Sequence, residues 1–384
     1  MHTVTNLVDP LSPILRDALA TASSLVPLKS LRHGYLEELF QHASALSLFH
    51  GQYLFEKGQS DKRYIFLLSG EVALNFSAAK KLASTSERLE ANCVRLNAQN
   101  CISALAHTQP RACSAIALGD VLAVAIDVSR LQQCLAWSQT TDYMLSELAV
   151  SPDFDGDLDW IKTVLSSNLF IKVPPTNARH IIPELEPLSV KAGERLIREG
   201  EVGDCCYFLK SGEAQVLKTI DGAERALAKI SPGRCFGEDA LIDDKPRNAS
   251  VEFVSDAELL RLDKKAFVRL LSEPEVDSLS WSDRAERVLV DIRTDAEYGL
   301  GHLDQAVNVP LAVMAMKRRL LNKEQAYLLY CDSGLRSRSA THLLSQQGYN
   351  VAALHGGLEA QGLTTMLTQH KSYLLRDGRA APVE

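Results

Sequence analysis

The chain contains an internal repeat of short strand-like segments that are separated by glycines. Gly51–Gly58 parallels Gly193–Gly200, and Tyr64–Glu71 parallels Cys206–Glu213. The shared glycines stand where short strands must turn, and apolar residues alternate between them. This pattern is typical of an antiparallel roll of short strands. Two copies of one β-roll are therefore the simplest prediction for the first two thirds of the chain.

The second copy contains a polar stretch, Phe236–Ser250, whose residues suit a small cyclic phosphodiester. Gly237 lets the backbone approach a ligand closely, and the carboxylate of Glu238 can accept a hydrogen bond from a ribose hydroxyl. A short helical turn is expected at Asp239–Ile242, and its free N–H groups attract an anion such as a phosphate. Arg247 supplies a planar, permanently charged fork for two phosphate oxygens. The stretch therefore predicts a site for a small cyclic phosphodiester.

This stretch closely resembles the phosphate-binding cassette of the cyclic-nucleotide-binding family, because its Gly-Glu, Ala-Leu and Pro-Arg-x-Ala elements keep that family's spacing. The resemblance implies that Glu238 binds the ribose 2′-hydroxyl and Arg247 the cyclic phosphate, with backbone N–H groups near Ala240 and Asn248 completing the cradle. The ligand is expected to be cyclic AMP or cyclic GMP, which the sequence does not distinguish. The predicted binding residues are Phe236, Gly237, Glu238, Ala240, Leu241, Arg247, Asn248 and Ala249.

The first copy differs from the second at this site. When the two Pro-Arg pairs are aligned, Arg111 corresponds to Arg247, but Ile102 stands in the position of Glu238. Isoleucine cannot accept a ribose hydrogen bond, and a buried donor left unpaired costs about 1–3 kcal/mol. We therefore predict one nucleotide per chain, bound by the second copy, and a structural role for the first. A second roll that has also lost its ligand is the alternative.

The last quarter of the chain alternates between strand-like and helix-like segments. Val288–Ile292, Tyr327–Tyr330 and Val351–Leu354 are predicted strands, and a helix is expected from about Ser337 to Gln347. Strands separated by helices predict a parallel sheet with helices on both faces.

Cys331 follows the second of these strands and precedes the helix. Small ligands bind at this edge of a parallel sheet, and the N–H groups of such a loop can form an anion nest. The helix N-terminus and Arg336 favour the thiolate, which is the nucleophilic form of cysteine. The predicted active-site loop consists of Cys331, Asp332, Ser333, Gly334, Leu335 and Arg336.

Most of residues 287–361 resemble the rhodanese domain. The matching pieces are Asp291–Arg293, Glu297–Tyr298, Gly301–His302, Ala306–Pro310, the Cys331 loop and Leu354–Gly357. The resemblance implies that Cys331 is the persulfide-carrying nucleophile and that Asp332–Arg336 form the anion-cradling loop, in which Arg336 is predicted to be catalytic. It also implies that Asp291 and Arg293 organise the site without touching the substrate. In this fold a six-residue loop suits sulfur transfer. Asp332 is a departure, because its negative charge beside the cysteine is expected to weaken the attraction for dianionic donors such as thiosulfate.

Two functions follow from these features. The first is a cyclic-nucleotide sensor coupled to a sulfurtransferase, which takes sulfur from a small donor and passes it to a thiol acceptor. The second is a non-enzymatic sensor whose rhodanese domain binds a partner. Cys331 with Arg336 favours the enzyme, and Asp332 favours the sensor. Transcriptional regulation is disfavoured, since only Ser272–Glu286 separates the second roll from the next strand.

Composition restricts the class of protein further. The 384 residues carry a formal net charge of −7, which gives no support for general nucleic-acid binding. No apolar run reaches the roughly eighteen residues of a membrane span, and the N-terminus lacks the pattern of a secretory signal. None of the eight cysteines forms a Cys-x-x-Cys pair, so neither a zinc site nor a disulfide framework is expected. We predict a cytoplasmic protein without a metal site, and a homodimer is left open.

The predicted fold class is multidomain, with two antiparallel β-rolls and flanking helices followed by an α/β rhodanese-like domain with a parallel sheet. Because the helices after the second roll lead directly into that domain, we expect coupling between the nucleotide site and the Cys331 loop. Two independent domains are the alternative. The predicted boundaries are an N-terminal helical segment at 1–30, a degenerate roll at 31–140, a linker at 141–158, the nucleotide-binding roll at 159–275, the rhodanese-like domain at 280–366 and a C-terminal tail at 367–384.

Overall fold

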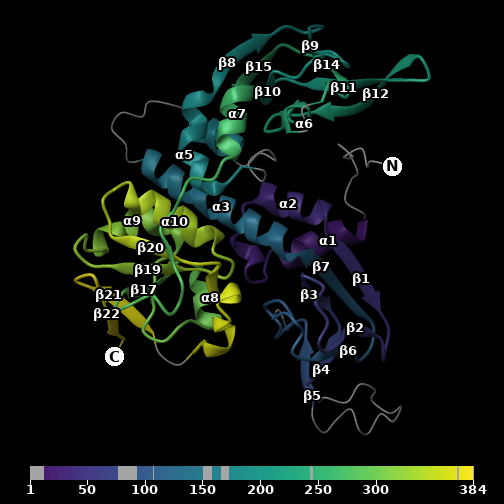
Figure 1. The fold of residues 1–384 in the computed structure, drawn as a ribbon. Helices are drawn as coiled ribbons and strands as arrows, with labels where there is room; N and C mark the ends of the chain where they lie inside the picture. Colours follow the sequence, from purple (N-terminus) through teal and green to yellow (C-terminus); the bar gives the residue numbers. More distant parts are fainter. Residues whose placement is uncertain are drawn as a thin grey trace.

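Two β-rolls and a C-terminal α/β domain make up the protein, as a computed structural model shows (Figure 1). Each roll consists of two antiparallel sheets, and the α/β domain contains a five-stranded parallel sheet. The predicted fold class is therefore confirmed. The structure describes residues 13–76, 93–106, 108–149, 158–165, 173–242, 245–369 and 372–383.

The first roll follows two helices, α1 (Pro13–Ala22) and α2 (His33–Gln41). Its sheets have the strand orders β1-β7-β3 and β2-β6-β4-β5, and inward-facing apolar residues such as Phe55, Ile65 and Val72 form the core between them. The strands are β1 (Ser44–Leu48), β2 (Tyr53–Phe55), β3 (Arg63–Ser69), β4 (Glu71–Asn75), β5 (Cys93–Asn97), β6 (Ser114–Ala117) and β7 (Val121–Asp127).

The second roll repeats this arrangement with the strand orders β13-β10-β15-β8 and β12-β11-β14-β9. Asp221 and Gly222, both with positive φ (53° and 77°), turn the chain between the paired strands β11 and β12. A short cassette helix, α6 (Asp239–Ile242), precedes β14, and α7 (Lys264–Leu271) follows β15. The strands are β8 (Glu186–Val190), β9 (Arg195–Ile197), β10 (Cys205–Ser211), β11 (Ala214–Ile220), β12 (Ala223–Ile230), β13 (Cys235–Phe236), β14 (Ser250–Phe253) and β15 (Ala257–Asp263).

Equivalent glycines make equivalent contacts in the two rolls. The backbone N–H of Gly58 donates to the carbonyl of Arg111 at 2.8 Å, and that of Gly200 donates to the carbonyl of Arg247 at 2.8 Å. Both glycines have positive φ, +85° and +86°, which residues with a side chain rarely adopt. The repeat therefore has a physical cause, because each roll needs the same turn next to its arginine.

The α/β domain has the strand order β16-β20-β19-β17-β18. Its sheet includes residues 278–279, because β16 pairs with β20, so this sheet begins before the predicted boundary at 280. The predicted C-terminal tail contains a β-hairpin at 373–382. The elements are β16 (Ser278–Leu279), β17 (Val288–Asp291), α8 (Asp295–Leu300), β18 (Val307–Asn308), α9 (Met314–Lys317), β19 (Tyr327–Tyr330), α10 (Leu335–Ser345), β20 (Val351–Leu354), α11 (Gly357–Ala360), β21 (Tyr373–Arg376) and β22 (Arg379–Pro382).

Helix α3 (Val128–Leu148) occupies part of the predicted linker. We predicted a linker at 141–158, but residues 141–148 form the last two turns of this buried helix. Helix α3 contacts α2 of the first roll, α4 (Leu158–Leu165), α5 (Ala178–Ile181), and α10 of the α/β domain. It is therefore a shared core element between the domains (Figure 1). The rest of the predicted linker, 150–157, lies outside the described residues, as do residues 1–12 of the predicted N-terminal segment.

Within the described ranges, none of the helices has the length and apolar character that a membrane crossing requires. The same part of the chain contains no group of three or more His, Cys, Asp or Glu side chains that could hold a metal ion.

Candidate functional site

The predicted nucleotide-binding residues of the second roll gather around Arg247. The Arg247 side chain is buried, and its Nη1 donates to the carbonyl of Gly237 at 2.6 Å while Nη2 donates to the carbonyl of Cys205 at 2.7 Å. Glu238, which follows Gly237 and begins the cassette turn, is also buried. A buried guanidinium and a buried carboxylate in one short segment can bind a phosphate and a hydroxyl with little competition from water.

Two glycines let the walls of this site approach one another. A Cβ atom on Gly237 would lie 2.8 Å from Nη1 of Arg247, and φ of Gly237 is +86°. A Cβ atom on Gly203 would lie 2.7 Å from Cβ of Ala240. We expected Gly237 to make room for a ligand. In the structure it makes room for the arginine that is expected to bind the ligand.

The remaining cassette residues take different positions. Phe236 is buried and stacks on Tyr207, with 5.5 Å between the ring centroids. Ala240 and Leu241 are buried in α6, whereas Ala249 is half-buried. Asn248 is exposed, and the predicted role of its backbone N–H stays a prediction.

In the first roll, Arg111 is already paired. Its side chain is buried, and Nη2 forms an ion pair with Oδ1 of Asp61 at 2.9 Å. Its Nη1 donates to the carbonyl of Ala106 at 2.9 Å, and its guanidinium lies 4.4 Å from the ring centroid of Phe55. Ile102 is half exposed, at 50%. Arg111 therefore offers no uncompensated charge to a phosphate. Aligning the two copies did not identify Asp61 as the partner of Arg111, because the nearby aspartate of the second copy, Asp204, is shifted by one position in that alignment.

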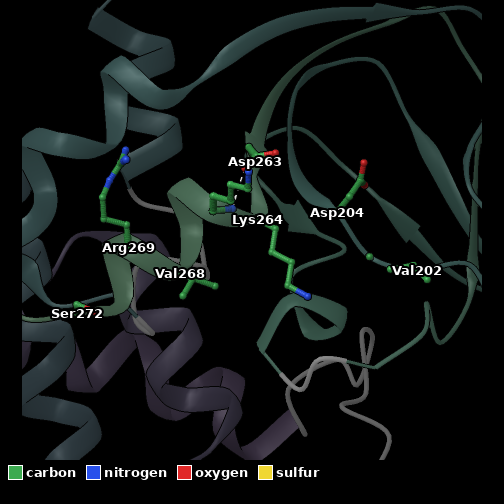
Figure 2. Close-up of a pocket in the computed structure, with 9 residues that line it drawn as sticks. Val202, Asp204, Asp263, Lys264, Val268, Arg269 and Ser272 are labelled. Carbon is green, nitrogen blue, oxygen red and sulfur yellow. Dashed lines mark hydrogen bonds between the residues drawn. The ribbon is translucent and has the colours of Figure 1, made fainter.

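A cavity of about 690 Å³ lies between α7 and the loop at residues 202–204. Figure 2 shows Val202 and Asp204 on one side and Val268 and Arg269 on the other. Asp204 is 3.5 Å from Nη2 of Arg247, but neither Arg247 nor Glu238 lines the cavity. Its volume is within the range of small-molecule pockets, and it adjoins the cassette without containing its two charged groups.

The second candidate site is the Cys331 loop, between β19 and α10. Cys331 is fully buried, and its Sγ atom accepts a hydrogen bond from the backbone N–H of Gly334 at 3.2 Å. The Ser337 Oγ atom lies 3.7 Å from the same sulfur. Gly334 has a φ of +87° and begins α10. The loop therefore points a backbone donor at the sulfur, as an anion nest does.

Asp332 shares two arginines with other carboxylates. Its carboxylate accepts from Nη1 of Arg293 at 3.0 Å and from Nη2 of Arg336 at 3.0 Å. Arg293 also pairs with Asp291, and Arg336 also pairs with Glu297, so two cations face three carboxylates. The expected weakening of the attraction for dianionic donors therefore stays a prediction.

Arg336 is fully buried and holds Glu297 with two hydrogen bonds of 2.9 Å. Burial alone would raise the pKa of the Glu297 carboxyl, but the charge and hydrogen bonds of Arg336 hold that pKa below its ordinary value. Arg336 thus fixes the start of α10 against α8. Its predicted role as a catalytic residue stays a prediction. Glu297 was part of the matching sequence pieces, but its pairing with Arg336 had not been inferred.

Asp291 and Arg293 form an ion pair at the end of β17, and their role in organising the loop stays a prediction. Asp291 is fully buried and accepts from Nη2 of Arg293 at 2.7 Å. Arg293 also donates to the carbonyl of Gly301 at 2.7 Å. Through Asp332, this pair connects the end of β17 to the Cys331 loop.

Gly357 allows α11 to hold the other side of the loop. The backbone N–H of Leu358 donates to the carbonyl of Cys331 at 2.9 Å, and that of Glu359 donates to the carbonyl of Asp332 at 3.0 Å. A Cβ atom on Gly357 would lie 2.4 Å from the Asp332 carbonyl oxygen. Only glycine therefore fits between α11 and the loop.

Replacing Gly357 with alanine is expected to destabilise the α/β domain more than replacing Gly362 with alanine. Both residues have positive φ, +69° and +65°, but an added Cβ meets the loop at Gly357 and nothing within 4 Å at Gly362. Each variant loses about 1–2 kcal/mol from backbone strain, and Gly357→Ala loses about 1–3 kcal/mol more from overpacking. Denaturant titration measures the free energy of unfolding of both variants. Equal losses would contradict the expected clash between an added Cβ at Gly357 and the Cys331 loop.

Comparison with known proteins agrees with these two sites. The cyclic nucleotide-binding domain family matches residues 187–273, and the rhodanese-like domain family matches residues 274–361. The cAMP-dependent protein kinase regulatory subunit of Emericella nidulans is 37% identical over 107 residues, which is 28% of this chain and 26% of that protein. The chain thus spans about a quarter of the length of the first such relatives.

Other relatives include bacterial and structurally characterised proteins. The cyclic AMP receptor protein of Thermus thermophilus is 30% identical over 144 residues, covering 32% of this chain and 67% of that protein. The solved regulatory domain of Toxoplasma gondii PKA with cAMP is 17% identical, and the match covers 69% of this chain and 94% of that chain with a TM-score of 0.27. This chain belongs to the cyclic nucleotide-binding domain family through residues 187–273 and carries a rhodanese-like domain at residues 274–361.

Proposed function

We propose that this protein is a cyclic-nucleotide-responsive sulfurtransferase that carries sulfur as a persulfide on Cys331. The observation that carries the proposal is the 3.2 Å hydrogen bond from the Gly334 N–H to the Cys331 sulfur, in a loop fixed on both sides. A backbone donor directed at sulfur stabilises a thiolate and a persulfide anion. All eight cysteines are free thiols, which supports the predicted cytoplasmic location.

The proposed chemistry has two balanced steps. In the first, the Cys331 thiolate attacks the outer sulfur of thiosulfate, a new S–S bond forms, and the donor's S–S bond breaks as sulfite leaves with the electron pair. In the second, an acceptor thiolate attacks the outer sulfur of the Cys331 persulfide and releases the Cys331 thiolate. No net oxidant or reductant is consumed, because the sulfur only changes its carrier.

Cyclic AMP is the nucleotide we propose for the second roll. The relatives named as regulatory subunits of cAMP-dependent kinase and the receptor protein named for cyclic AMP support this choice. Burial of both Glu238 and Arg247 supports binding at the cassette. Cyclic GMP is the competitor to be tested, since the exposed Asn248 contributes no buried contact that would select a base.

A second candidate function is supported by the complete burial of Cys331. A sulfur with no exposed surface cannot meet a donor in this arrangement. A rhodanese-like domain that acts only by binding a partner would need no such access.

Two measurements on the full chain test the proposal. Calorimetric titration is expected to show one site per chain with higher affinity for cyclic AMP than for cyclic GMP. Incubation with thiosulfate, followed by peptide mass spectrometry, is expected to add one sulfur atom to Cys331. Two equivalent nucleotide sites would contradict the first assignment. Absence of a persulfide with thiosulfate and with an organic persulfide donor would leave the partner-binding function.

A further inference from the structure

The Cys331 loop is in contact with the first roll, and the proposed function does not account for this contact. Ser333 donates from Oγ to Oε1 of Gln132 on α3 at 3.2 Å. Gln132 is 1% exposed and Cys331 is 0% exposed. Ser333 and Gln132 are 201 positions apart in the chain, so the hydrogen bond joins two domains.

A second contact reaches the loop through α11. Tyr64 on β3 donates its hydroxyl proton to Oε1 of Glu359 at 2.7 Å. The backbone N–H of Glu359 in turn donates to the Asp332 carbonyl. Burial, with the nearby charges of Asp332 and Glu359, raises the pKa of Tyr64 well above its ordinary value. The hydroxyl therefore keeps its proton and stays a donor.

Polar residues lie along one face of α3, and this face includes Gln132, which contacts Ser333. Gln132, Gln139, Tyr143 and Glu147 are separated by seven, four and four residues, so they lie on one side of the helix. The Gln139 side chain is buried, and neither its Oε1 nor its Nε2 has a hydrogen-bond partner among the described residues. A buried amide without partners makes a contact less stable than an apolar one. This face suits a contact that opens.

Glu147, at the end of this face, joins all three domains. Its carboxylate forms ion pairs with Arg179 on α5, which leads into the second roll, and with Arg318 of the α/β domain. Gln347 of the α/β domain also donates to Oε1 of Glu147 at 3.2 Å. A displacement of α5 relative to α3 therefore changes the ion pairs of Glu147, which also binds Arg318 of the α/β domain.

We propose that β3 and α3 form an inhibitory cover over the Cys331 loop, through Tyr64 and Gln132, and that Glu147 links this cover to the nucleotide-binding roll. This cover regulates the proposed sulfurtransferase. The inference rests on that proposed function, in which the open loop transfers sulfur. With the cover closed, the sulfur of Cys331 has no exposed surface. A donor reaches it only after the cover has moved. The first roll, whose own arginine is paired with Asp61, thereby acts on the third domain.

Alkylation of Cys331 by iodoacetamide in the full chain tests the cover without requiring any activity. The variant that combines Tyr64→Phe with Gln132→Ala loses both hydrogen bonds and keeps the ring of Tyr64. Two such bonds change the open population by about five- to 150-fold, so the rate of Cys331 alkylation is expected to rise by that factor. Peptide mass spectrometry measures the rate at each cysteine separately.

The matched control combines Tyr53→Phe with Gln133→Ala, which makes the same substitutions at an exposed and a half-buried position of the same domain. Its alkylation rate at Cys331 is expected to equal that of the wild type. Cys113, buried in the core of the first roll, reports unfolding of that roll. An unchanged rate in the Tyr64→Phe, Gln132→Ala variant, or a faster rate that Cys113 shares, would overturn the cover.

Saturating cyclic AMP tests the link through Glu147. Cys331 has no exposed surface in the closed state, so a larger open population is measured as faster alkylation of Cys331. We expect cyclic AMP to accelerate alkylation in the wild type and in Glu38→Gln, an acidic control in the same domain, but not in Glu147→Gln. No acceleration in a wild-type protein that binds cyclic AMP overturns the link. Absence of cyclic AMP binding contradicts the proposed function instead.

Discussion

Replacing Arg247 with alanine is expected to lower the affinity for cyclic AMP by about 30- to several thousandfold, which corresponds to about 2–5 kcal/mol. Arg247 and Glu238 are buried in the cassette, and in the variant the cyclic phosphate loses its cationic partner. Phosphate oxygens that lose this partner in a partly dehydrated site are still desolvated, and no ion pair compensates for that cost. Calorimetric titration of the full chain with cyclic AMP measures the loss.

Arg111→Ala is the matched control for this experiment. Arg111 is as deeply buried as Arg247 and occupies the same position of the repeat, but its partner is Asp61. Its removal leaves a partly buried carboxylate unpaired, so the first roll is expected to lose stability while the nucleotide affinity stays unchanged. Tight cyclic AMP binding by Arg247→Ala, or a large loss of affinity in Arg111→Ala, would contradict the assignment of the site.

Local sequence features predicted the elements that depend on nearby residues. The cassette turn Asp239–Ile242 and the strands Tyr327–Tyr330 and Val351–Leu354 were predicted with the bounds that the structure shows. The two strands are short apolar runs, so the local sequence largely determines their extent. The rolls could be predicted because their glycines must adopt positive φ at fixed positions.

Helix α3 could not be predicted, because its burial depends on residues far away in the chain. Its segment Ser138–Asp142 is polar and suggests a turn when read alone. In the structure, α2 and the α/β domain pack around it, and tertiary burial overrides the weak local preference. The same holds for the contact between Tyr64 and Glu359, which are 295 positions apart.

The electrostatic surroundings of Asp332 also could not be predicted from the sequence. The sequence places a carboxylate next to Cys331, and repulsion of an anionic donor follows from that alone. The structure adds Arg293, 39 positions earlier in the chain, which pairs with the Asp332 carboxylate together with Arg336. The net charge of a loop therefore depends on neighbours that only the fold brings together.

Replacing Cys331 with serine is expected to reduce sulfur transfer to the rate of the reaction without enzyme. Serine is nearly isosteric and can still accept the hydrogen bond from Gly334. Its hydroxyl stays protonated at neutral pH and cannot carry a persulfide, so the variant loses the nucleophile and keeps the loop. Steady-state rates with thiosulfate, and the mass of the Cys331 peptide, measure the effect.

Cys93→Ser is the matched control, because Cys93 is a half-buried thiol on β5 of the first roll. It is expected to keep the full rate. The cyclic AMP affinity of Cys331→Ser is expected to equal that of the wild type, since the variant changes one atom in a loop outside the second roll. Turnover that survives in Cys331→Ser would show that another thiol carries the sulfur. A persulfide on Cys331 with no transfer to any thiol acceptor would contradict the second step of the proposed chemistry.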